Sequence, residues 1–225
     1  MKRTRSISGN GDALKRVFVI SPHPDDESIG CGGAIRGHVV QGVSVRVVFL
    51  TSGEKGGHGR SPEETIRIRE IEAKAAARVL GVESVEFWHE PDGAVCASGA
   101  LVARLGDLLR QWRPQVIYVP HDQEMHPDHR AACRLVRRAV NMAFPRIHRP
   151  TVMQFEVWTP LQGIDHIVDV SRYMKVKMAA IRAYRSQCAV MRFDEALLGL
   201  NRYRGEMHSW PGGDYAEVFT IWRKT

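Results

Sequence analysis

The chain has 225 residues, of which 44% are hydrophobic and 25% are charged, and its formal net charge at pH 7 is +7. This length and composition are typical of a globular protein that can bury a sizeable core. No uninterrupted apolar run approaches the length of a membrane span, and we find no internal repeat or low-complexity tract. We therefore expect no membrane-spanning segment.

The first residues, MKRTRSISGNGDALKR, are basic and polar and lack the apolar segment of a secretory signal. We expect residues 1–14 to form a disordered arm and residues 15–225 to form a single domain. The four cysteines lie far apart and form no CxxC pair, so we expect a reducing, cytoplasmic location without a disulfide framework: Cys31, Cys96, Cys133 and Cys188.

The positive net charge is compatible with an anionic substrate or with nucleic acid. The basic residues, however, are spread along helical stretches and rarely alternate with aromatic side chains. The densest group surrounds an amphipathic helix: Arg130, Arg134, Arg137 and Arg138. We interpret this group as a solvated helix face and expect no nucleic-acid partner.

Strand-like and helical segments alternate along the first two-thirds of the chain. In order, the apolar patterns predict a strand at Arg16–Ser21, a helix near Gly33–Val40, a strand at Val43–Thr51, a helix between Ser61 and Gly81, a strand at Ser84–Trp88, a helix at Ala100–Gln111, a strand at Gln115–Pro120 and a helix at His129–Asn141. The remainder predicts strands at Thr151–Trp158 and His166–Val170, a helix capped by Ser171 that runs to about Arg185, and a last strand at Tyr215–Trp222.

This alternation predicts an α/β fold, Rossmann-like, with a mostly parallel sheet, helices on both faces, and the C-terminal strands added at the edge. Ligands bind such sheets at the carboxyl ends of the strands. Gly30, Gly32 and Gly33 lack the spacing of a dinucleotide-binding motif and indicate close packing of the chain instead.

Two loops that follow predicted strands combine imidazole and carboxylate groups. The first is Ser21-Pro-His-Pro-Asp-Asp-Glu27, and the second is His121-Asp-Gln-Glu-Met-His-Pro-Asp-His129. Catalytic zinc takes three nitrogen or oxygen ligands and leaves a position for water. His23, Asp26 and His129 supply such a set, although two histidines and a carboxylate also suit iron(II).

The neighbouring side chains have the properties of catalytic groups. Asp25 lies beside the predicted metal without having to bind it and can accept a proton from water. His126 can stabilise an oxyanion or protonate a leaving amine. Asp128 can accept a hydrogen bond from a ligand imidazole. Each loop taken alone is equally compatible with a capped helix start, whereas the two together favour a metal site.

These residues resemble the PIG-L/LmbE family of zinc-dependent N-acetylglucosaminyl deacetylases. The similarity rests on five segments in the family's order: SPHPDDESIGCGGAI, TSGEKGG, Arg69-Ile-Arg-Glu72 with Leu80-Gly81, Pro91-Asp92-Gly93, and His126-Pro-Asp-His129. It covers roughly residues 15–140 and continues weakly through Ala180–Gln187. Some relatives have a tyrosine where this chain has Glu124.

The resemblance implies an LmbE-like fold and a hydrolase that removes the acetyl group from an N-acetylglucosamine-type sugar or its conjugate. It implies one Zn²⁺ ion, with other divalent metals as alternatives, held by His23, Asp26 and His129. It further implies Asp25 as the general base and His126 as the group that stabilises the transition state. Arg69 and Asp92 are expected to bind sugar hydroxyls.

Three alternatives remain open at this stage. One is an amidase of the same family that acts on a thiol–sugar conjugate or on another non-acetyl amide. Another is a metal-free or nucleic-acid-binding module. Assembly into a homo-oligomer also stays open. Arginines in the C-terminal third, such as Arg192, Arg202 and Arg204, together with His208, suggest an anionic aglycone.

Overall fold

A computed structural model describes residues 14–145, 149–208 and 213–222. Residues 1–13 of the predicted N-terminal arm lie outside the described residues. In the described residues, none of the helices combines the length and apolar character needed to cross a bilayer.

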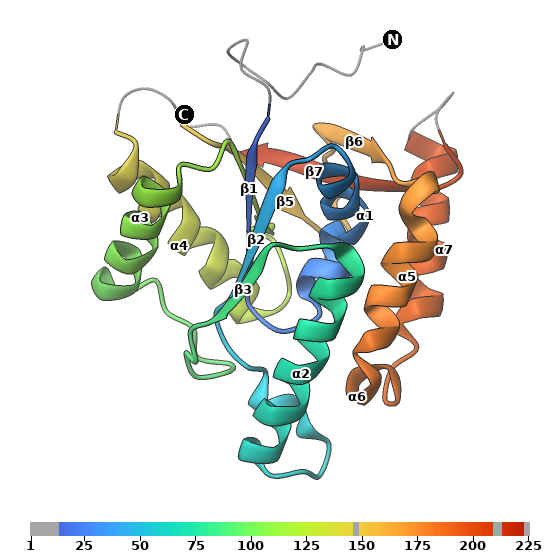
Figure 1. Cartoon of the computed structure of the whole chain (residues 1–225), viewed down its shortest axis with the longest axis horizontal. Helices are drawn as coiled ribbons and strands as arrows, with labels where there is room; N and C mark the ends of the chain where they lie inside the picture. Colours follow the sequence, from blue (N-terminus) through green and yellow to red (C-terminus); the bar gives the residue numbers. More distant parts are fainter. Residues whose placement is uncertain (1–13, 146–148, 209–212, 223–225) are drawn as a thin grey trace.

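The chain forms a seven-stranded sheet with the strand order β3-β2-β1-β4-β5-β7-β6 (Figure 1). The strands are β1 Arg16–Ser21, β2 Ser44–Phe49, β3 Ser84–Phe87, β4 Val116–Pro120, β5 Thr151–Phe155, β6 His166–Asp169 and β7 Ala216–Trp222. The first five strands pair in parallel, and β7 pairs antiparallel with both β5 and β6. The predicted α/β fold, with the C-terminal strands at the edge, is confirmed.

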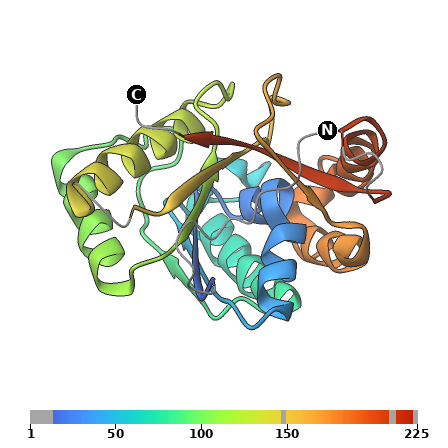
Figure 2. The ribbon, with the colours of Figure 1, turned by 90° about the horizontal axis from the view of Figure 1, so that it is seen from above.

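Helices cover both faces of the sheet (Figures 1 and 2). They are α1 Asp26–Val40, α2 Pro62–Leu80, α3 Gly99–Trp112, α4 Pro127–Ala143, α5 Met174–Ala183, α6 Arg185–Cys188 and α7 Phe193–His208, with 3-10 turns η1 Glu54–Gly57 and η2 Ser171–Tyr173. One apolar core joins the sheet to α3 and α4, and a second joins its other face to α1, α2 and α5. Because both faces are covered, the central strands β1 and β4 are almost entirely buried.

The first helix begins earlier than predicted. It starts at Asp26, directly after β1, rather than near Gly33. A Cβ atom at Gly30 would lie 2.0 Å from the Phe155 ring, and one at Gly33 would lie 2.5 Å from Val170. These glycines therefore permit close packing of α1, as predicted, while they weaken the helical pattern in the sequence.

The C-terminal third differs most from the prediction. The predicted cap at Ser171 is wrong, since its hydroxyl donates to Asp169 and the segment opens with the 3-10 turn η2 before α5. Helix α7 was not predicted. Its buried positions include Asn201 and Arg204, so it has no continuous apolar stripe.

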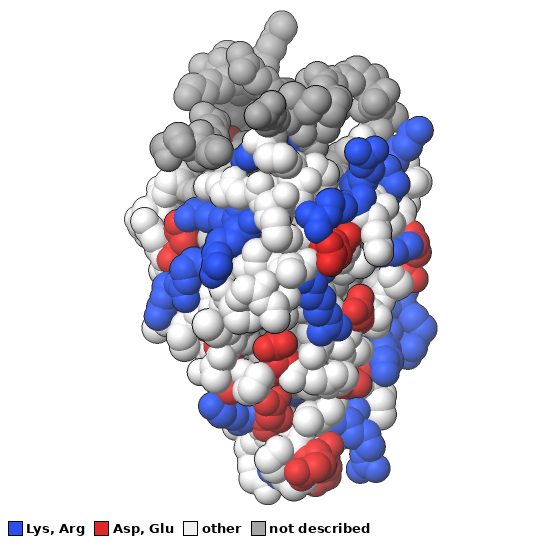
Figure 3. All heavy atoms as spheres, turned by 90° about the vertical axis from the view of Figure 1, so that its left-hand side faces the viewer, with Lys and Arg blue, Asp and Glu red and all other residues white. Residues whose placement is uncertain are grey.

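The arginines around α4 do not form a free basic surface. Arg137 pairs with Asp122 at 2.7 Å, and Arg130 donates to the carbonyl of Glu124. On this side of the molecule, basic groups are separated by acidic and uncharged surface (Figure 3). This arrangement agrees with a solvated helix face.

Candidate active site

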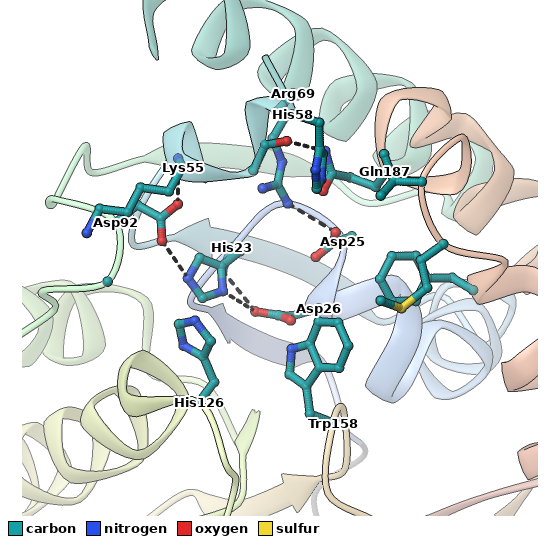
Figure 4. Close-up of a pocket in the computed structure, with 15 residues that line it drawn as sticks. His23, Asp25, Asp26, Lys55, His58, Arg69, Asp92, His126, Trp158 and Gln187 are labelled. Atoms are coloured by element: carbon teal, nitrogen blue, oxygen red, sulfur yellow. Dashed lines mark hydrogen bonds and ion pairs between the residues drawn. The ribbon is translucent and has the colours of Figure 1, made fainter. Parts of the chain in front are cut away.

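A cavity of about 320 Å³ lies where the sequence placed it, at the carboxyl ends of the parallel strands (Figure 4). Strand β1 lies between β2 and β4, so the loops that follow these strands meet where the strand order reverses. The lining residues include those of both predicted loops: His23, Asp25, Asp26, Lys55, Gly56, His58, Arg69, Asp92, Gly93, His126, Trp158, Gln187, Val190, Met191 and Phe193.

The three predicted metal ligands come together at this cavity, which His23 and Asp26 line. Asp26 Oδ2 lies 3.2 Å from His23 Nδ1 and 3.2 Å from His129 Nε2. His129 is fully buried, and its two ring nitrogens face the carboxylates of Asp26 and Glu124 without a well-oriented hydrogen bond to any group in the described parts of the chain. A buried imidazole with an unsatisfied nitrogen beside a carboxylate suits a cation, so the residues fit a metal ion.

Two overlapping groups in the described residues have the spacing of a metal site. One contains His23, His126 and His129, and the other contains His23, Asp92 and Asp128. His23 belongs to both: its ring centroid lies 4.7 Å from that of His126, and its Nε2 lies 3.2 Å from a carboxylate oxygen of Asp92 and 3.2 Å from one of Asp128. Burial opposes a charge on His23, yet its hydrogen bonds to the surrounding aspartates, led by Asp128, hold its pKa well above the usual value.

Asp25 occupies a constrained position at the start of α1. Its φ angle is +124°, a region that non-glycine residues rarely adopt, and its side chain makes no capping hydrogen bond to the helix. The carboxylate faces Arg69, whose Nη2 lies 3.0 Å from Asp25 Oδ2. Burial raises the pKa of Asp25 to about 7, although the Arg69 cation opposes this shift. Such a carboxylate is suited to proton transfer near neutral pH.

Arg69 is buried and is held by backbone groups as well as by Asp25. Its guanidinium donates to the carbonyl oxygens of Pro24 and Gly53. Gly53 has a φ angle of +67°, and a Cβ atom there would lie 2.1 Å from Arg69 Nη1, so only glycine leaves room for this contact. Arg69 therefore fixes the loop that carries Asp25. Its predicted contact with sugar hydroxyls stays a prediction.

His126 both starts a helix and lines the cavity, so the two interpretations of its loop, a capped helix start and a catalytic site, apply together. It is the N-cap of α4, and its Nδ1 accepts a hydrogen bond from the backbone amide of Asp128. A neutral ring that accepts at Nδ1 carries its proton on Nε2, which makes Nε2 a donor. Burial and the neighbouring imidazolium of His23 lower the pKa of His126, which favours this neutral form.

Asp92 and Asp128 each accept hydrogen bonds from the backbone of another segment of the site. Asp92 Oδ2 accepts from the backbone amide of Lys55, while Asp128 accepts from the amides of Gly93 and Val95. Asp128 Oδ2 lies 3.2 Å from the His23 imidazole, and its predicted role as a partner of a metal ligand stays a prediction. Asp92 lines the cavity, and its predicted role in sugar binding stays a prediction.

Glu124 is a buried residue whose role the sequence did not indicate. Its carboxylate accepts hydrogen bonds from three consecutive backbone amides, those of residues 157–159. It also lies 3.4 Å from His129 Nδ1 and 3.4 Å from His121 Nε2. The signal in the sequence was an acid two residues before His126, in the loop that already contained the predicted ligand His129.

The cavity also has an apolar side that the sequence did not predict. It consists of Trp158, Val190, Met191 and Phe193, which come from the loop after β5 and from the segment at the start of α7. The arginines expected to favour an anionic aglycone have carboxylate partners: Arg192, Arg202 and Arg204 pair with Glu195, Glu206 and Glu156, respectively.

Comparison with known proteins gives a consistent family and fold. Residues 18–140 match the sequence model of the PIG-L family, described as GlcNAc-PI de-N-acetylase. The chain is 30% identical over 188 residues to the diacetylchitobiose deacetylase of Thermococcus kodakarensis, in an alignment that covers 77% of this chain and 70% of that protein.

Two solved structures show the same architecture over most of their length. The N,N'-diacetylchitobiose deacetylase of Pyrococcus horikoshii, complexed with its inhibitor MPG, is 28% identical with a TM-score of 0.82, over 92% of this chain and 84% of that one. GalB, the 4-carboxy-2-hydroxymuconate hydratase of Pseudomonas putida KT2440, is 26% identical with a TM-score of 0.84, over 94% and 98%. Two different reactions therefore occur on this fold.

Proposed function

The chain belongs to the PIG-L family, and from this premise we propose that it hydrolyses the N-acetyl group of an N-acetylglucosamine-type sugar or its conjugate. The products are acetate and the free amine. One observation carries the proposal: Asp25 and His126, a base and a donor, line the same cavity as His23 and Asp26, and Asp26 in turn contacts His129.

The proposed metal ion is zinc, held by His23, Asp26 and His129. This ligand set has the nitrogen and oxygen donors of catalytic zinc sites, and the unsatisfied nitrogen of His129 supports it. Bound there, zinc would supply Lewis acidity towards the substrate carbonyl and towards water.

The protein groups then move the protons. Asp25 accepts a proton from the attacking water as oxygen bonds to the acetyl carbon, and Arg69 keeps the carboxylate aligned. His126 keeps its proton and donates a hydrogen bond from Nε2–H to the carbonyl oxygen as negative charge develops there. The C–N bond breaks, and the departing amine takes the proton that Asp25 accepted, so Asp25 returns to its starting state.

The test is acetate release from N-acetylglucosaminides by the purified protein. Chelation should abolish the release, and added zinc should restore it. Asp25→Asn should lose nearly all turnover and keep its zinc, because the side chain keeps its shape but no longer accepts a proton. Turnover that survives complete metal removal would overturn the metal-dependent reaction, and loss of zinc from Asp25→Asn would mean that Asp25 is a ligand.

Hydration of an unsaturated carboxylic acid is the second candidate, because GalB has a TM-score of 0.84 to this chain. An assay with 4-carboxy-2-hydroxymuconate separates the two functions. The amidase alternative within the family is tested by substrates with other acyl groups.

The four free cysteines support the proposed cytoplasmic location.

A further inference from the structure

The walls of the cavity differ in chemical character. Lys55, His58 and Asp92 lie on one side of the His23–Asp26 pair, and Trp158 lies across that pair from Lys55 and Asp92 (Figure 4). Polar groups suit the hydroxyls of a sugar ring. Four lining residues offer apolar contact, two of which meet ring to ring, and we call them the apolar wall: Trp158, Val190, Met191 and Phe193.

The apolar wall is exposed to a degree that needs an explanation. Trp158 is 41% exposed, Val190 is 53% exposed and Met191 is 43% exposed. Large apolar side chains that gather at one exposed place mark a binding surface more often than those scattered singly. Because this group lines the candidate active site, the ligand that covers it is expected to extend from that site.

Contacts within the protein hold the apolar wall in place. The rings of Trp158 and Phe193 meet edge to face, with centroids 5.7 Å apart. The backbone amide of Trp158 donates to Glu124, the buried acid that also faces His129. The indole is thus a fixed platform whose position is tied to the candidate metal site.

The charges beside the apolar wall are neutralised by protein partners. Arg192, next to Met191 in the chain, pairs with Glu195. Arg204 is buried in an ion pair with Glu156, which precedes Trp158 by two residues. These cations are already paired with carboxylates, which argues against an anionic ligand on this side.

We propose that the apolar wall binds the aglycone of the substrate, and that this aglycone is uncharged and presents an apolar face. An aryl group, an alkyl group or the C–H face of a second pyranose ring has this shared chemistry. The inference rests on the proposed deacetylase function. The inference places the amino sugar between the catalytic groups and the polar side of the cavity, formed by Lys55, His58 and Asp92. The substituent of the sugar is then directed towards Trp158.

The experiment compares acetate release from three substrates: free N-acetylglucosamine, its phenyl β-glycoside and its malate glycoside. The phenyl glycoside should have the highest kcat/KM. Trp158→Ala should lower the ratio of kcat/KM for the phenyl glycoside over the free sugar by about tenfold, the loss of one aromatic contact. Trp158→Phe should restore most of that ratio. Tyr203→Ala removes another exposed aromatic side chain, one that does not line the cavity, and should leave the ratio unchanged.

Preference for the malate glycoside, or an equal loss on all substrates in Trp158→Ala, would overturn the inference. The second result would mean that the indole serves only to hold the loop. Calorimetric binding of phenyl N-acetyl-β-glucosaminide to Asp25→Asn tests the apolar wall without turnover. Suppose that no substrate releases acetate. If the binding is nevertheless weaker in the Asp25→Asn/Trp158→Ala double variant, the proposed function is wrong but the proposed ligand site is retained. If the binding is unchanged in that variant, the proposed function and the proposed ligand site are both wrong.

Discussion

Replacement of Glu124 by glutamine tests how the candidate metal site is oriented. The carboxylate is 1% exposed, and its Oε2 lies 3.4 Å from His129 Nδ1. A carboxylate only accepts, so it favours a proton on Nδ1, and Nε2, which lies 3.2 Å from Asp26 Oδ2, is then the nitrogen available to a metal ion. A glutamine amide at this position would donate to Nδ1 and move the proton to Nε2, where it opposes metal binding.

The expected effect on metal affinity is a loss of about 10- to 100-fold, the usual result when the carboxylate partner of a ligand histidine is removed. This corresponds to about 1.4–2.8 kcal/mol. The fold should survive, because the glutamine carbonyl can still accept from the amide of Val157, which is the shortest of the three backbone contacts at 2.7 Å.

The assay is zinc affinity by competition with a chromophoric chelator, together with ring-nitrogen NMR of His129 in the metal-free protein. The spectra are recorded above pH 9, where the ring is neutral, because burial is outweighed by Asp26, which raises the pKa of His129 to about 9. Glu70→Gln is the matched control, because Glu70 contacts His89 at 2.9 Å and neither residue lines the cavity. Equal zinc affinity in Glu124→Gln and the original protein, with the His129 tautomer unchanged, would refute the reasoning.

Two further predictions concern stability. Glu217 forms a fully buried ion pair with Lys177 at 2.6 Å, so Glu217→Ala should lower the free energy of unfolding by about 3–5 kcal/mol in urea titrations. Glu206→Ala is the control, because it breaks an exposed ion pair and should lower that free energy by under about 1 kcal/mol. Equal losses in the two variants would contradict this prediction. Burial lowers the pKa of His38 to about 4, so the unfolded chain binds a proton first as pH falls. Stability should therefore fall between about pH 6.5 and pH 4, by about 3 kcal/mol from this residue. His38→Gln keeps a partner for the Tyr118 hydroxyl and should flatten that part of the pH profile; an unchanged slope would exclude His38 as its source.

The sequence predicted the parallel part of the fold because its signals there are local. Ser61 accepts from the amide of Glu64 and Gly81 adopts a φ angle of +83°, as the capping pattern of α2 indicated. The later helices lack such signals. Helix α7 buries polar residues, one of which, Arg204, becomes buried only through its ion pair with Glu156, 48 residues earlier in the chain.

The position of the candidate site could be predicted because its two histidine- and aspartate-containing loops directly follow strands β1 and β4. The resemblance to the PIG-L/LmbE family is confirmed by the match over residues 18–140. The assigned roles of His23, Asp25, Asp26, His126 and His129 stay predictions, although the structure brings these residues together.

The C-terminal third completes this site through contacts that no local pattern contains. Tyr184 donates to Glu27, next to the predicted ligand Asp26, and Gln187 donates to the carbonyl of Gly56 in the loop around Arg69. The apolar wall lies wholly beyond residue 140, where the match to the family ends. The residues proposed for hydrolysis therefore lie within the family match, while the residues proposed to select the aglycone lie outside it. A change of aglycone along this family would then require replacement of residues such as Trp158 and Met191 and leave the His-Pro-Asp-Asp and His-Pro-Asp-His loops intact.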